Sequence, residues 1–555
     1  MPINLASPGI LVKEVDLTIG RVDSATDKNA AIVLTAEKGP VNIPIICESE
    51  QDLIDNFGKP KTTDKHYENW MVAASYLAYG GILSVVRSKG SKLSNANAQY
   101  DGTTGIGITI NSVDDYIAKG YDDNEISNAA VVAKNPGSWA NNLKVAIIDG
   151  KVDQVLTHGG NIGAPPVGYG VTAPITTVNP GVGTWGALNG YLKGIITEST
   201  TTTMGVKVLS HVNSSGVEKE VDYQANGVYR FSQGQTLSVY RNSDAVGVAT
   251  TTISIEPTDW FDAQEIVLSN GQNIKWNNVA ERPGTSAYAA ARNSRFDETH
   301  VVVIDDFGGI SGTAGTIIEK NLSVSKAKDG EFSAGTSSYW RKFLENNSDY
   351  IFGGGQTDTY GGATGICTSA FKTNKDGTIN GNGFVFAGDN TWDQYAQDVK
   401  FAVRGNVGYA LTEGKNYDGN YNITTDTALT PTVGDLVSGY ELFENVEEYD
   451  VDFLLMGAGS YGREQTQALA NKIISVAEIR KDAVAFISPD RTTFFEESGD
   501  EVNIGLKDAS KMTDNVISFF APITSSTYAV FDSGYKYMYD RFANTFRYIP
   551  LNGDI

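Results

Sequence analysis

Cysteine is almost absent from this sequence. Cys47 and Cys367 are the only two among 555 residues, and both stand in apolar surroundings without a paired spacing. Neither a disulfide framework nor a cysteine-based zinc site can be built from them. Both are expected to be reduced thiols in a hydrophobic core.

Long apolar runs and basic clusters are also missing. No stretch approaches the roughly 18 apolar residues that cross a bilayer, and the N-terminal sequence MPINLASPGILVKEV has no basic region followed by a long apolar one. Lys and Arg number 43 against 66 Asp and Glu, which gives a formal net charge of −23. The chain is therefore expected to be made in a cytoplasm, without membrane insertion and without direct nucleic-acid binding.

What the chain has is length, glycine and aromatic residues. Its 555 residues exceed the roughly 250–300 at which single cores stop growing, so two to four domains are expected. Fifty-nine glycines punctuate short apolar runs, a pattern typical of sheet-containing domains. The fold class we predict is mixed, α+β and α/β, in several domains. In chain order these are an N-terminal arm (1–22), a discontinuous central α+β domain with β-rich insertions (23–90 and 128–380), a small outward-facing β insertion (91–127) and a C-terminal β-α-β layered domain (381–555).

The arm is predicted from an apolar run that has strand character but is followed by a polar stretch. Its strand residues, predicted to pair with another subunit, are Ile10, Leu11, Val12, Lys13, Glu14 and Val15. A strand without a local partner is unsatisfied until another chain supplies a sheet edge.

The last third of the chain alternates strands and helices. Apolar runs at 451–457, 482–488 and 526–533 predict strands, and helical spacing predicts a helix over 463–480 and another near 506–518. This alternation indicates a layered domain with parallel neighbouring strands.

The sequence Gly457-Ala-Gly459-Ser-Tyr-Gly462 matches the GxGxxG pattern between a strand and a helix. It has two interpretations: a dinucleotide site, with a pyrophosphate at the helix N-terminus, or a tight turn. Glu464 in the first helical turn would repel a phosphate, and Asp490 lies beyond a Ser-Pro break where a ribose-binding acid should end the second strand. We favour the turn.

No catalytic or metal site is predicted, and no cofactor. The four histidines lie far apart, and none shares a short motif with Ser or Cys. His300 is interpreted as a structural residue at the start of a strand. An acidic cluster lacks the spacing of a calcium loop and is either a solvated face or a patch complementary to a basic partner; its members are Glu441, Glu444, Glu447 and Glu448.

Several segments together resemble the tail sheath family of contractile-tailed bacteriophages (myoviruses). They occur in one order from residue 7 to residue 555: SPGILVKEVD, AEKGP, DNFGKP, YLAYGGILSVVR, AKNPGSWANNLKV, RPGTS, DETHVVVIDDFGGISGTAGTIIEK, AEIRKDAVAFISP and SGYKYMYDRFANTFRYIPLNGDI. None is a catalytic motif, so the specificity of the resemblance comes from their number and order.

The resemblance implies a structural subunit, not an enzyme, that forms stacked hexameric rings around the tail tube in the virion. Its partners would be other copies of itself, the tail tube protein, and the baseplate and tail terminator proteins. Contraction would drive the tube through the host envelope, after assembly in the host bacterial cytoplasm. In this family an N-terminal and a C-terminal arm add strands to neighbouring subunits.

The sequence departs from the family pattern at one point, and two rival interpretations of it remain. Family members usually continue past a segment like YIPLNGDI, so a further C-terminal domain is expected to be absent from this sequence. The rival interpretations are another phage or injector shell component, and a nucleotide-dependent oxidoreductase built on the glycine motif.

Overall fold

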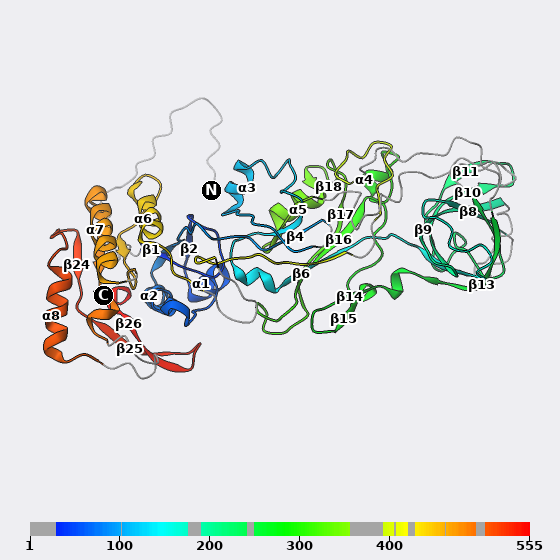
Figure 1. Ribbon diagram of the computed structural model, residues 1–555. Coiled ribbons are helices and arrows are strands. Elements are labelled where there is room, and N and C mark those ends of the chain that lie inside the picture. The colour runs from blue at the N-terminus through cyan, green and yellow to red at the C-terminus, as the bar shows by residue number, and fades with distance from the viewer. Residues whose placement is uncertain are drawn as a thin grey trace, which may run out of the picture.

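The computed structural model describes residues 29–100, 103–175, 190–240, 249–355, 392–403, 407–419, 428–460, 462–495 and 506–555. They form an elongated molecule with an α/β domain at one end, a mixed central body in the middle and a β-barrel at the other end (Figure 1). None of the helices in these ranges combines the length and the apolar character needed to cross a bilayer.

The α/β domain is built on a sheet whose strands come from both ends of the chain. In sheet order they are β2 (Pro44–Cys47), β3 (Ile82–Arg87), β1 (Asn29–Leu34), β22 (Phe453–Leu455), β23 (Val484–Ile487) and β24 (Ala529–Phe531). All pairs are parallel except the one between β2 and β3. The parallel alternation predicted for the last third is therefore confirmed.

The pairing of β1 with β22 differs from the predicted domain boundary. Residues 29–87 lie in one sheet with the C-terminal segment, whereas the sequence pattern placed 23–90 with the central domain (128–380). Parallel pairing between segments so far apart in the chain leaves no local signal, because periodicity reports only which face of a strand is buried.

Strand β1 is buried on both faces, which explains its continuous apolar sequence. Ala31 and Val33 face the core beneath three helices, while Ala30, Ile32 and Leu34 face the core beneath two others. The first group is α6 (Val433–Glu441), α7 (Arg463–Arg480) and α8 (Ala509–Phe520); the second is α1 (Glu50–Phe57) and α2 (His66–Ala78).

Local signals set the helix ends. Ser49 and Asp52 form a reciprocal capping box at the start of α1, and Gly58 ends that helix with a φ of 87°. Helix α7 begins at Arg463 and ends at Arg480, the bounds that its apolar spacing predicts.

The central body contains two antiparallel sheets around one core. One sheet is β17 (Thr316–Ser325), β16 (Glu298–Asp305), β6 (Leu143–Ile148) and β21 (Val407–Ala410); the other is β20 (Ile351–Gly353), β5 (Ala129–Ala133) and β4 (Asn97–Gln99). Shorter elements are α3 (Val113–Ala118), α4 (Ala287–Ala290), β18 (Glu331–Ser333), β19 (Thr336–Ser337) and α5 (Trp340–Asn347). Trp340 and Trp392 meet edge to face in this core, 5.9 Å between ring centroids.

The prediction of an outward-facing β insertion over 91–127 is wrong. The segment contributes strand β4 and helix α3, and Ala96 and Ala98 are buried in the main core of the central body. Its polar residues are buried because they replace missing backbone partners: the Asn95 amide donates to the carbonyls of Ile110 and Ala133, at 3.0 and 2.9 Å. A polar, irregular segment can be buried when its hydrogen bonds are satisfied in this way.

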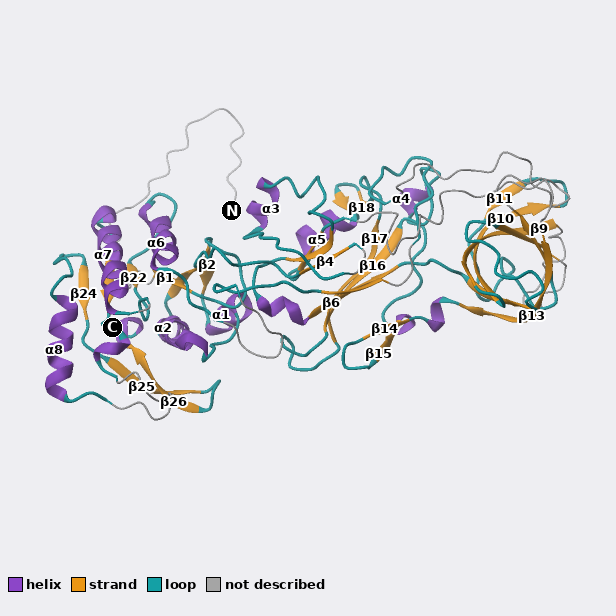
Figure 2. Ribbon diagram, viewed as in Figure 1, coloured by secondary structure: helices purple, strands orange, loops and turns teal. Residues whose placement is uncertain are grey.

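The barrel is a closed ring of six strands. They are β10 (Thr203–Asn213), β7 (Gln154–His158), β13 (Ala249–Asp259), β12 (Thr236–Tyr240), β8 (Gly170–Ile175) and β9 (Gly190–Ser199), and β9 pairs back to β10. Figure 2 shows the ring nearly end on. Strand β11 (Glu218–Glu220) adds to β10 outside the ring, and the hairpin β14 (Glu265–Val267) with β15 (Asn273–Lys275) follows the barrel.

A C-terminal hairpin returns to the α/β domain. Strands β25 (Tyr535–Asp540) and β26 (Thr545–Pro550) precede a 3₁₀ turn, η9 (Leu551–Gly553). Ile549 is buried in the same core as α1 and α2, and Asn552 is buried in the turn.

Candidate functional site: the glycine turn and the sheet edges

The glycine turn lies at the carboxyl end of β22, where the connections of the parallel sheet diverge in two directions. Gly457 and Gly459 have φ angles of 69° and 81°, in the left-handed region that glycine adopts at low cost. In an open parallel sheet this crevice is the usual ligand site, so the partners of the turn decide between the two interpretations of the motif.

Three main-chain amides of the turn are bound by the chain's own side chains. The Gly457 amide donates to Asn552 Oδ1 at 3.1 Å, and the Ala458 amide donates to Asn69 Oδ1 at 2.7 Å. The Ser460 amide donates to Thr466 Oγ1 at 3.1 Å. A pyrophosphate would need these donors, so the motif acts here as a strand-to-helix turn.

Asp490, the residue considered for ribose binding, is also occupied within the chain. It is buried, and its carboxylate accepts hydrogen bonds from the Thr492 amide and the Thr493 hydroxyl, at 3.1 and 3.0 Å. It therefore caps the short turn that follows β23.

A polar cluster under the hairpin fills the rest of the crevice. Asn552 Nδ2 donates to the Gly457 carbonyl and to Ser488 Oγ, at 2.8 and 2.7 Å, and the Ser488 hydroxyl donates to Asp532. Burial raises the pKa of Asp532 to about 6, partly offset by the hydrogen bonds from Ser488 and the Gly534 amide. The crevice thus holds the chain's own C-terminal segment.

His300 is structural, as predicted from its place at a strand. Its Nδ1 accepts from the Ser323 amide and its Nε2 lies 2.8 Å from the Glu281 carbonyl, so both ring nitrogens are bonded to the main chain. Burial lowers its pKa, which favours the neutral ring. Among the described residues no group of His, Cys, Asp or Glu side chains is arranged to hold a metal ion.

The structure brings the four acidic residues together at the end of α6 and the turn that follows it. Lys472 from α7 pairs with Glu441 at 3.0 Å and with Glu444 at 2.9 Å, while Glu447 and Glu448 are exposed. Two of the four carboxylates thus share one lysine within the domain.

Strand β24 and helix α8 form an apolar edge that sequence reasoning did not identify. Strand β24 is the last strand of the sheet, and its Val530 and Phe531 are 38% and 40% exposed. Ile517 of α8 is 62% exposed, and Phe520 contacts the Phe531 ring, 5.0 Å between centroids. An edge strand with exposed apolar side chains is a place where a further strand can pair. The arm residues Ile10 to Val15 lie outside the described residues.

The turn amides bound within the chain and the crevice filled by the C-terminal segment argue against a dinucleotide site here, and β24 leaves a sheet edge exposed. Over 565 residues the chain is 24% identical to the tail sheath protein of Enterobacteria phage T4, covering 100% of this chain and 72% of that protein. It is 24% identical to the tail sheath protein of Vibrio phage KVP40 (100% and 73%) and 20% identical to that of Salmonella phage ViI (99% and 68%). Over its whole length the chain is thus similar to tail sheath proteins of three myoviruses, which confirms the resemblance.

Solved structures give weaker similarities. The sheath tail protein of Listeria innocua matches with 8% identity and a TM-score of 0.27, over 94% of this chain and 68% of that one. That of Desulfitobacterium hafniense matches with 8% identity and a TM-score of 0.14, over 40% and 37%. No family model matches the chain.

Proposed function

We propose that this protein is the repeating subunit of a contractile phage tail sheath. It polymerises as stacked hexameric rings around the tail tube, meets baseplate and terminator proteins at the two ends, and contracts to drive the tube through the host envelope. The observation that carries the proposal is the similarity to tail sheath proteins from three phages across the whole chain. Assembly takes place in the host cytoplasm, and the subunit has no catalytic role.

Subunits are joined by strand exchange through the N-terminal arm, residues 1–22. The arm of one copy, with Ile10 to Val15 as its strand, pairs with a sheet edge of a neighbour. Strand β24 supports this proposal because it is a sheet edge with exposed apolar side chains, and strand addition supplies main-chain hydrogen bonds without a preformed pocket. The acidic patch, with Glu447 and Glu448 exposed, faces the tube or a neighbouring subunit.

Contraction is a rigid-body movement of subunits in which strand pairing persists. A metastable assembly does work by exchanging small interfaces for larger ones, so no nucleotide is consumed. Each subunit carries a formal charge of −23, and closer packing must overcome repulsion between copies. Added salt screens this repulsion over roughly 10 Å at 0.1 M and roughly 3 Å at 1 M, so it eases the contracted form modestly.

Negative-stain microscopy of the concentrated protein, combined with an NAD titration followed by fluorescence, tests the proposal against its rivals. Rings or tubes that do not respond to NAD are expected. A monomer at all concentrations, with a saturable fluorescence change on adding NAD, would contradict the proposal and support the oxidoreductase interpretation.

A further inference from the structure

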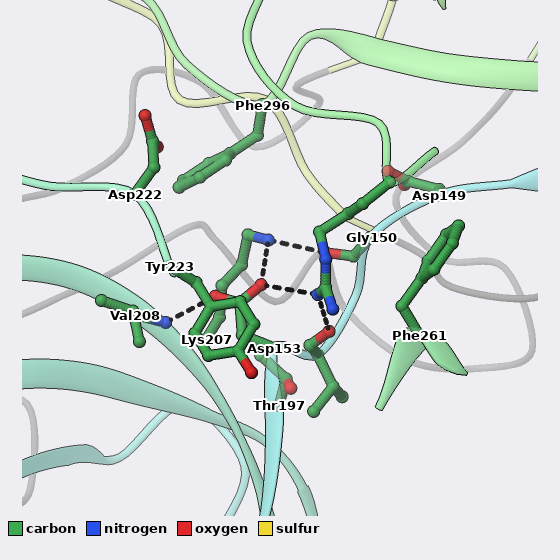
Figure 3. A network of polar contacts seen from close by, with 12 residues as sticks. Asp149, Gly150, Asp153, Thr197, Lys207, Val208, Asp222, Tyr223, Phe261 and Phe296 are labelled. Carbon is green, nitrogen blue, oxygen red and sulfur yellow. Dashed lines mark hydrogen bonds and ion pairs between the residues drawn. The ribbon is translucent and has the colours of Figure 1, made fainter. Parts of the chain in front are cut away.

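The barrel is joined to the central body at a neck where charged side chains are buried. The chain enters the barrel after β6, through residues 149–153, and leaves it after β13, at Asp259. We define the neck as these two crossings together with the body and barrel residues that bind them. Figure 3 shows its centre, with Asp153 between charged and aromatic side chains.

Asp153 is the hub of the neck. Its side chain is 5% exposed and lies 3.2 Å from Arg282 Nη1 and 3.5 Å from Lys207 Nζ. The Val208 amide donates to its second oxygen at 2.8 Å, and Arg282 also pairs with Asp259. Asp153 lies on the chain segment that enters the barrel and Asp259 on the segment that leaves it. Arg282 comes from the central body, so one arginine binds both segments.

Aromatic rings hold Arg282 in place. The Tyr223 ring from the barrel lies 4.9 Å from its guanidinium carbon, and the Phe261 ring lies 5.3 Å away. Tyr223 donates to Asp259 at 3.1 Å. A guanidinium that stacks on rings and pairs with two carboxylates is fixed in orientation as well as in position.

A second set of contacts repeats this arrangement on the far side of the neck. Arg295 of the body donates to the carbonyls of Leu209 and Val221, both at 2.8 Å, and pairs with Asp222 at 2.6 Å. Lys400 of the body pairs with Glu220 of the barrel at 2.8 Å. These contacts flank β10 and β11, opposite the crossing that Arg282 binds.

The charges at the neck are sorted by domain. The body supplies the cations that cross the boundary (Arg282, Arg295 and Lys400), and the barrel supplies the anions (Asp153, Asp259, Glu220 and Asp222). Lys207 is a barrel cation, and it donates to the Gly150 carbonyl in the crossing at 2.7 Å while lying 4.5 Å from the Phe296 ring of the body. Asp153, Arg295 and Lys400 are buried, whereas Asp222 and Glu220 are exposed. A swing of the barrel would take partners away from the three buried charges, which is unfavourable.

We infer that the neck is an electrostatic clasp that fixes the barrel in one orientation, so that barrel and central body move as a single lever. The clasp is a property of the isolated chain and does not depend on the proposed function. The consequence for contraction does rest on the proposed function: in a contracting sheath the barrel keeps its angle to the body, and the movement takes place at contacts between subunits.

Distance measurements between spin labels on the two parts test the clasp in the unassembled chain. Labels are placed through Val217→Cys in the barrel and Leu322→Cys in the body, whose native side chains are 60% and 39% exposed. Cys367→Ser removes one native thiol, and Cys47 is buried. The expected result is one narrow distance distribution, broadened roughly twofold or more when Arg282→Met and Arg295→Met together remove the two arginines that join the body to the barrel.

Arg230→Met is the matched control. It removes an arginine whose ion pair with Glu256, at 2.7 Å, lies within the barrel and is partly exposed, so the distribution should not change. A wild-type distribution as broad as that of the double variant, or a double variant as narrow as the wild type, would overturn the inference.

If the double variant does not fold, the clasp is tested by measuring the distance distribution of the labelled wild-type chain at several salt concentrations. Between about 0.1 M and about 1 M salt, exposed pairs are screened but buried ones are affected much less. The distribution should therefore keep its width across the series. Broadening with salt would show that the neck is held by solvent-exposed charges and would overturn the clasp.

Discussion

Replacing Asn552 with alanine tests whether the C-terminal hairpin closes the crevice of the α/β domain. Its side chain is 1% exposed and makes three hydrogen bonds, two of them to the amide and carbonyl of Gly457. The alanine variant leaves both Gly457 groups buried without these partners. Each such group costs about 1–3 kcal/mol, so the free energy of unfolding should fall by roughly 2–5 kcal/mol, allowing for water that enters the space.

Differential scanning calorimetry measures the change. For a unit of 150–250 residues, 1 kcal/mol lowers Tm by about 2–4 °C, so the transition of the α/β domain should move down by roughly 4–20 °C. Asn346→Ala, at an exposed position of helix α5, should change stability by no more than about 0.5 kcal/mol. If Asn552→Ala melts within about a degree of this control, the hairpin does not close the crevice as described.

Three further substitutions test the packing and charges of the same domain. Gly439→Ala places a Cβ 2.6 Å from Val33 Cγ1 and should cost about 1–3 kcal/mol in chemical denaturation; Gly434→Ala on the same helix meets only an ordinary contact and should be neutral or stabilising. The raised pKa of Asp532, about 6 in the fold, means that the folded state binds the extra proton, so its carboxylate lowers stability increasingly as pH rises from about 4 to about 6. Asp532→Asn should therefore gain in Tm relative to wild type by pH 7, and a Tm difference that is constant with pH would contradict this. Arg87→Leu removes a buried guanidinium that donates to four main-chain carbonyls and should lower the free energy of unfolding by roughly 2–5 kcal/mol in urea titrations; a loss below about 1 kcal/mol would refute that reasoning.

Signals within a few residues of one another were enough to predict the regular elements. The box of Ser49 and Asp52 marks the start of α1, and the apolar spacing of residues 463–480 predicts α7. Each signal acts through the hydrogen bonds or the buried face of its own element, so it is visible in the sequence.

Contacts between distant segments could not be predicted in this way. The pairing of β1 with β22, the closure of β9 on β10 and the Asn552 contact to Gly457 all join residues whose local patterns do not name their partners. The burial of segment 91–127 could not be predicted for a related reason: its asparagines look like turn residues, yet they satisfy the backbone of neighbouring strands. The glycine motif could be interpreted as a turn from the sequence alone, because Glu464 and the position of Asp490 argue against a bound dinucleotide.

The central claim is that this chain is a structural subunit that assembles through its N-terminal arm. The most direct test is negative-stain microscopy of the full chain beside a chain lacking residues 1–20, under the same conditions and without ATP. The account predicts ordered rings or tubes for the full chain and none for the deletion, whose far-UV circular dichroism should show that the rest remains folded. Sheath of normal length from the deleted chain, or assembly and contraction that require ATP, would contradict it.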